Sequence, residues 1–121
     1  MDWGRSRGIA TVVAVSDGTA SIYYSTGGGA IGGAYARPSI RNAALHAVAI
    51  AGKFLDHMQL TDNFPPPEAD GFAFYVVTKR GVYAAKASLD LLRTNQHPLS
   101  ELNNAMQTII TEYRILDSSP N

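Results

Sequence analysis

The stretch Ile9–Ser25, IATVVAVSDGTASIYYS, decides the fold. Two runs rich in β-branched and aromatic residues, Ile9–Val15 and Ala20–Ser25, flank the residues SDGT at 16–19. Asp-Gly between two such runs is typical of a β-hairpin, because a type I′ turn needs positive φ at both central residues. We therefore predict a β-hairpin that turns at Asp17-Gly18.

A second pair of short apolar runs lies further along the chain. Phe72–Thr78 and Val82–Ala87 flank Lys79-Arg80-Gly81, whose glycine suits a turn. Both alternating sets of residues in Phe72–Thr78 are apolar, which is typical of a central strand covered on both faces. The two hairpins together predict an antiparallel sheet.

An amphipathic helix follows each hairpin. Apolar residues recur at helical spacing over Pro38–Met58, where the proline suits the first helical position, and again over Ser100–Tyr113. The order is thus ββαββα, an α+β fold with an antiparallel sheet from two β-hairpins and two amphipathic helices packed on it. We expect one domain over residues 1–121, with a flexible N-terminal arm at 1–8 and a flexible tail at 117–121.

Composition limits the function classes. Apolar residues make up 45% of the chain and charged residues 17%, with ten basic and ten acidic side chains. A balanced charge argues against nucleic-acid binding, which needs a basic face. No apolar run approaches the roughly 20 residues that span a bilayer, so we expect no membrane partner and a cytoplasmic location. Few charges favour self-association.

The glycine-rich tract Gly27–Gly33 is the first candidate site. It forms either a loop or an irregular edge strand around Ile31 that another backbone approaches closely. Gly27, Gly29 and Gly32 match the dinucleotide-binding pattern G-x-G-x-x-G. In that fold the helix starts inside the motif and the strands are parallel, whereas here the helix starts later and the strands form a hairpin. We therefore expect no bound dinucleotide.

A weaker candidate is an anion or small-ligand site beside this tract. The N-terminus of the helix that begins near Pro38 offers free N–H groups, and two arginines lie next to it. The candidate contacts are Gly28, Gly29, Tyr35, Arg37 and Arg41. The alternative interpretation is that both arginines lie on a solvated first turn.

Catalytic and metal-binding patterns are not found in the sequence. There is no cysteine, which excludes thiolate chemistry, and there is no G-x-S-x-G motif. The histidines are His46, His57 and His97, and the first two stand about 16 Å apart on one helix, too far to share a metal. We assign no catalytic residue, no cofactor and no metal.

The element order resembles that of the small profilin-like domains, which include the Roadblock and longin domains. The resemblance rests on the Asp17-Gly18 hairpin, the apolar helix Pro38–Met58, the hairpin Phe72–Ala87 and the closing helix Ser100–Tyr113. It implies a five-stranded antiparallel sheet with helices packed on it, and a dimerising scaffold or a regulator of small GTPases rather than an enzyme. The chain lacks the helix before Ile9 that Roadblock domains have.

Three functions follow from these observations. The first is a non-catalytic interaction or regulatory module that forms a homodimer, favoured by the low charge and the broad apolar surface of the helix Pro38–Met58. The second is a small-ligand or anion-binding domain that uses Gly27–Gly33 and the start of that helix. The third is an enzyme of unrecognised type. A second copy of the chain is the partner that we expect first.

Overall fold

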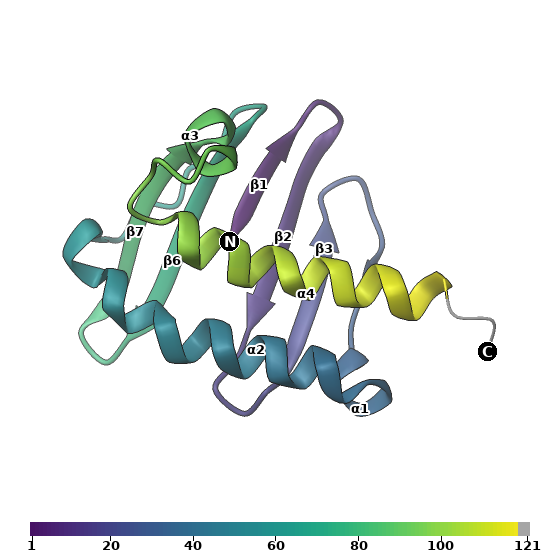
Figure 1. Cartoon of the computed structure of the whole chain (residues 1–121). Helices are drawn as coiled ribbons and strands as arrows, with labels where there is room; N and C mark the ends of the chain where they lie inside the picture. The colour runs from purple at the N-terminus through teal and green to yellow at the C-terminus, as the bar shows by residue number, and fades with distance from the viewer. Residues whose placement is uncertain (119–121) are drawn as a thin grey trace.

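The computed structural model describes residues 1–118, which form one antiparallel sheet with both long helices on the same face (Figure 1). The strands are β1 (Asp2–Arg5), β2 (Gly8–Ala14), β3 (Ala20–Tyr24), β4 (Gly29–Ala30), β5 (Gln59–Thr61), β6 (Gly71–Thr78) and β7 (Gly81–Ser88). Their order across the seven-stranded sheet is β4-β3-β2-β1-β6-β7-β5. The helices are α1 (Gly33–Ala36), α2 (Pro38–Ala51), the 3₁₀ helix η1 (Gly52–His57), α3 (Leu89–Arg93) and α4 (Ser100–Ser118).

The prediction of a ββαββα layout is wrong, although the fold is α+β. Both predicted hairpins are present, as β2–β3 and β6–β7, but the sheet has three further strands. One of them, β1, lies in the predicted flexible arm at 1–8 and occupies the middle of the sheet. Its Trp3 ring stacks on Phe72 at 5.4 Å, a contact that depends on tertiary pairing and leaves no local pattern.

The first hairpin turns where we predicted, but with a different geometry. The Val15 N–H donates to the Thr19 carbonyl, which leaves a three-residue loop rather than the two-residue type I′ turn. The Gly18 N–H donates to the Val15 carbonyl, and Gly18 has φ 91°. A type I turn followed by a left-handed glycine is the common solution for three-residue loops.

The long helices differ from the predicted ranges at their C-terminal ends. The helix predicted over Pro38–Met58 is α-helical only to Ala51, and it continues from Gly52 as η1. The helix α4 runs through Asp117 to Ser118 and so includes the start of the predicted tail. The rest of that tail, 119–121, lies outside the described residues. No helix within the described range is long and apolar enough to cross a membrane.

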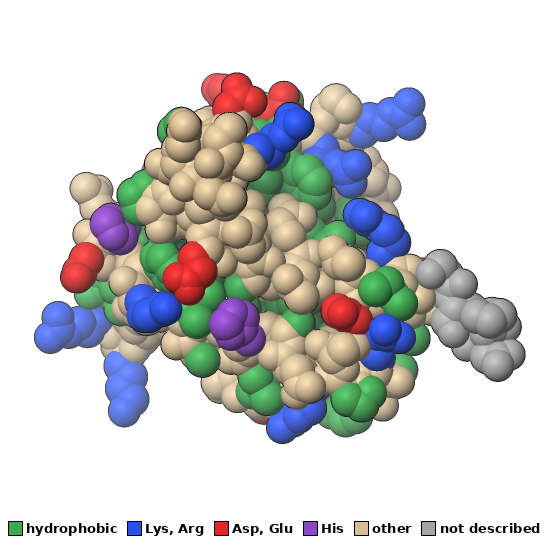
Figure 2. All heavy atoms as spheres, in the orientation of Figure 1, with side chains coloured by type: hydrophobic (Ala, Val, Ile, Leu, Met, Phe, Trp, Pro, Cys, Tyr) green, Lys and Arg blue, Asp and Glu red, His purple; other side chains and the backbone are tan. Residues whose placement is uncertain are grey.

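The core lies between the sheet and the helices α2 and α4, which run side by side across the strands (Figure 1). Its largest fully buried side chains come from both layers: Phe72, Phe74, Ile40, Leu92, Leu99, Ile109 and Val12. On the outer surface of the helices, charged side chains of both signs are scattered without forming one large patch (Figure 2).

The other face of the sheet is covered only in part, by the proline-rich connector between β5 and β6. Phe64 packs edge-on against Tyr75 at 5.5 Å, and the Tyr75 hydroxyl donates to the Pro65 carbonyl. Beyond the connector this face is open, and Val77 is 79% exposed. The prediction that Phe72–Thr78 is covered on both faces is therefore wrong at Val77.

Candidate functional site

A slot in the sheet is the feature that points to function. Strand β1 pairs with β2 on one side and with β6 on the other. It begins at Asp2, whereas both neighbours continue past that point, β2 through Val12–Ala14 and β6 through Phe74–Thr78. Apart from Met1, which bonds to Val12, these two segments have no strand partner on their facing edges within residues 1–118.

The width of the slot is set by β1. Neighbouring strands in a sheet lie about 4.8 Å apart, so the two strands that flank a third are held at about twice that distance. The pairing of Asp2 with Thr11 and with Ala73 imposes this separation at the end of the slot that meets β1, which we call its upper end. Where the slot meets β1, the space between β2 and β6 therefore has the width of a single strand.

Both walls of the slot direct backbone groups into it. In an antiparallel ladder the N–H and C=O groups of successive residues point alternately to either side. The Met1–Val12 pair exchanges two hydrogen bonds, so the same groups of Ala14, two residues on, face the slot. On β6 the Asp2–Ala73 pairing directs the N–H and C=O groups of Tyr75 and Val77 into the slot in the same way. An apolar occupant would leave these groups unsatisfied.

The slot opens into a mostly apolar cavity of about 770 Å³ that reaches the helices. Its floor is formed by side chains of α2, η1 and α4: Ala47, Val48, Ala51, Gly52, Leu55, Leu102 and Met106. Its walls come from β2 and β6, including Val12, Ala14, Phe74 and Val76. A volume of this size falls in the range of sites that hold ligands in proteins.

A polar cluster closes the upper end of the slot. The Met1 α-ammonium donates to the Val12 carbonyl at 2.9 Å, and the Thr11 hydroxyl donates to the Asp2 carboxylate at 2.7 Å. Burial lowers the pKa of the Met1 amino group, and the nearby Asp2 carboxylate partly opposes this effect. The polar end fixes β1 between its neighbours and marks where the apolar part of the slot begins.

Part of the glycine tract forms an edge strand of the sheet, and the rest of it is not in a strand. Gly29 and Ala30 form β4, which pairs with Ile22 and Tyr23 of β3. A Cβ at Gly29 would press on the Ile22 backbone, as expected for a close backbone approach. The tract then leads into the short helix α1, which begins at Gly33.

The residues of the predicted anion site are not brought together. Gly28 is exposed, and Tyr35 on α1 is 93% exposed. Arg41 reaches away from the glycine tract and donates to the Asp17 carbonyl of the first hairpin, where it also packs on Gly18. Arg37 is paired with a carboxylate of α4. Both arginines thus have partners within the chain.

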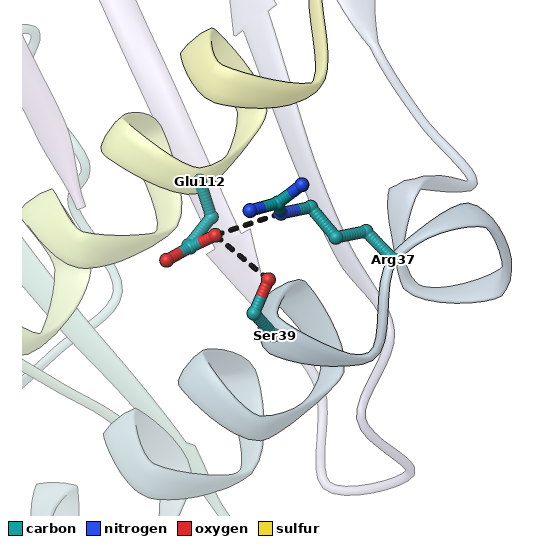
Figure 3. Close-up of polar contacts among 3 residues, drawn as sticks. All are labelled: Arg37, Ser39 and Glu112. Atoms are coloured by element: carbon teal, nitrogen blue, oxygen red, sulfur yellow. Dashed lines mark hydrogen bonds and ion pairs between the residues drawn. The ribbon is translucent and has the colours of Figure 1, made fainter. Parts of the chain in front are cut away.

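The Arg37 pair is a structural link between α4 and the start of α2 (Figure 3). One oxygen of the Glu112 carboxylate accepts hydrogen bonds from the Arg37 Nε at 2.9 Å and from the Ser39 hydroxyl at 2.7 Å. The Ser39 hydrogen bond, followed by that of Arg37, holds the pKa of Glu112 below its usual value. The carboxylate thus stays charged at neutral pH and compensates the arginine.

A metal site is not found in the part of the chain that the structure describes. No three His, Cys, Asp or Glu side chains gather there in a way that could hold a metal ion. Comparisons with protein-family models, with curated proteins and with solved structures find no match to this chain. The resemblance to profilin-like domains thus stays a prediction, although the sheet has seven strands rather than the five that it implies.

Proposed function

We propose that this domain is a non-catalytic interaction module that takes up one extended segment of a partner polypeptide in the slot between β2 and β6. The observation that carries the proposal is the pairing of β1, which occupies only the upper part of a space bounded by two longer strands. An added strand would complete the sheet, and main-chain hydrogen bonds are the source of affinity in this type of recognition. We place the domain in the cytoplasm.

The backbone edges favour a polypeptide over a small apolar ligand. A hydrocarbon would fill the cavity but would leave the inward-facing groups of Ala14, Tyr75 and Val77 without partners. Each unsatisfied buried group costs about 1–3 kcal/mol. The backbone N–H and C=O groups of an added strand alternate along its length, as the groups on β2 and β6 do, so they can pair with them. Such a strand also directs every second side chain into the cavity.

A capped pentapeptide, Thr-Leu-Thr-Leu-Thr, is the probe for this proposal. We expect it to bind with a Kd on the order of millimolar, since a short free peptide loses much translational and conformational freedom on binding. In two-dimensional NMR spectra the amide signals of Ala14, Tyr75 and Val77 should shift and saturate together. Their hydrogen exchange should slow, because they gain backbone partners.

An Ala14→Pro variant provides the matched test. Proline removes the N–H that faces the slot, and it leaves the neighbouring Val13 and Val15 groups free to pair with β3. We expect the variant to fold and to bind the pentapeptide at least about tenfold more weakly, as for one lost hydrogen bond. Binding of decanol in the slot together with no binding of the peptide would reject the proposal in favour of a small-ligand pocket.

We further propose that two copies of the domain associate through the uncovered sheet face. The exposed apolar side chains there are Val13, Val15, Tyr23 and Val77. A low charge fraction gives this patch little electrostatic protection, and closed two-fold dimers are the commonest assembly of soluble chains. The sequence offers two other seams, a sheet edge near the glycine tract and the helix α2, but α2 buries its apolar side against the sheet and α4.

Light scattering tests this association. We expect a mass of twice the 12.9 kDa of one chain at tens of micromolar, and a Tyr23→Glu variant should return to the monomer. Tyr35→Glu is the control, since Tyr35 is exposed on α1 and lies outside the patch. A wild-type mass near 12.9 kDa that does not change on a tenfold rise in concentration would contradict the dimer.

A further inference from the structure

We infer that the slot selects a strand with one large apolar residue at a defined position, two residues beyond Met1 along the line of β1. This inference rests on the proposed function. It identifies the partner as an extended polypeptide segment of alternating character, with a leucine- or phenylalanine-sized side chain directed toward the helices and small or β-branched side chains directed outward.

The register of β1 defines the positions of an inserted strand. Met1 lies opposite Val12, with its side chain in the core. Because side chains alternate between the faces, the next inserted residue along the line of β1 faces outward, between Val13 and Tyr75. The second inserted residue faces the helices, between Ala14 and Val76. The third faces outward again, between Val15 and Val77.

The second position lies above a hollow made by small residues. The residues that line the cavity from α2 and η1 include Ala47, Ala51 and Gly52, which carry a methyl group or no side chain at all. Leu55 and Met106 line the same cavity. The cavity of about 770 Å³ exceeds what a strand backbone alone occupies, so one inserted side chain has room to become buried.

The outward positions impose a different requirement. Val13 and Val77 are exposed at the mouth of the slot, at 36% and 79%, and Tyr75 lies beneath the connector. Side chains inserted here lie beside Val13 and Tyr75 or beside Val15 and Val77, and such half-buried positions in a sheet suit threonine or valine. The selected pattern is thus an outward β-branched residue, an inward large apolar residue and a second outward β-branched residue.

A tethered strand measures this preference in the full chain. The extension Met-Lys-Thr-Xaa-Thr is fused directly ahead of Met1, with Xaa as Ala, Leu, Phe or Asp. Every extension converts the buried Met1 ammonium into an amide, so the Ala version is the reference for that change. We expect the Leu and Phe versions to melt about 5–10 °C above the Ala version, and the Asp version below it.

Filling the hollow with a larger side chain from α2 should reverse the order of the melting temperatures. In an Ala51→Leu background we expect the Ala extension to become the most stabilising one, because the new side chain occupies the space of the inserted residue. Ala49→Leu is the matched control, since Ala49 is exposed on the same helix, and it should keep the original order.

The outcomes separate the two proposals. Equal melting temperatures for all four extensions, each above that of the unextended chain, would reject the side-chain preference and leave strand insertion standing. No rise for any extension, together with no binding of the free pentapeptide, would reject strand insertion itself. An Ala51→Leu chain that keeps the preference for Leu would also overturn the assignment of the hollow.

Discussion

Replacing Ile109 by Asp is expected to leave the chain unfolded at 25 °C. Ile109 is fully buried, and it lies on α4 where that helix packs on the sheet. The substitution removes the transfer free energy of a buried aliphatic side chain, about 2–3 kcal/mol, and adds the cost of an unpaired carboxylate, which is several kcal/mol more. Together these losses are comparable to the whole stability of a small domain, about 5–15 kcal/mol.

Circular dichroism at 222 nm and thermal melting measure this effect. Thr111→Asp is the control on the same helix, because Thr111 is exposed two residues further on. It should lower the melting temperature by only a few degrees, through the weaker helix propensity of aspartate. A cooperative transition of I109D close to that of the wild-type chain would place Ile109 outside the core and would contradict the packing of α4.

The sequence predicts the elements whose signals are local. The Asp17-Gly18 pair marks the first hairpin, and the stripe of Leu102, Met106 and Ile109 marks the buried side of α4. Both signals depend only on residues within a few positions of one another, so they can be recognised without knowledge of the tertiary structure. The Pro38 start of the helix α2 belongs to the same class.

Strands formed by tertiary pairing could not be predicted in this way. β1 and β5 have four and three residues, too few to show alternation. β5 is held by the distant β7, and β1 is held by the distant β6 as well as by β2, its neighbour in the chain. The slot depends on β1 lying between β2 and β6, so it had no sequence signal. The residues at its mouth, Val13 and Val77, read as ordinary members of apolar strands.

The partners of the two arginines in the predicted anion site could not be predicted from the sequence, for a related reason. Arg37 and Arg41 are one helical turn apart, and their spacing indicates a shared site. Their partners come from far along the chain: Glu112 lies 75 residues after Arg37, and Asp17 lies 24 residues before Arg41. Pairing between residues so far apart in the sequence cannot be predicted from a local pattern.

The largest effect expected outside the helices is that of Gly4→Ala, because Gly4 lies directly beneath the connector. Gly4 is buried in β1, and the Asp70 N–H donates to its carbonyl at 2.8 Å. A Cβ at this position would lie 2.7 Å from the Glu68 carbonyl carbon and closer still to its oxygen. Both are backbone atoms, so the variant must displace either the connector or β1 itself.

Overpacking of this kind costs about 1–3 kcal/mol, so we expect Gly4→Ala to lower the melting temperature by about 5–15 °C. Gly52→Ala is the matched control: nothing lies within 4 Å of its Cβ position, and the 3₁₀ helix that it starts accepts alanine. That change should leave stability equal or slightly raised, because alanine restricts the unfolded chain. The fluorescence of Trp3, the only tryptophan and the neighbour of Gly4, should report the displacement in Gly4→Ala alone. Equal melting temperatures for the two variants would mean that the connector does not lie on β1, and the covered part of the outer sheet face would then have to be assigned again.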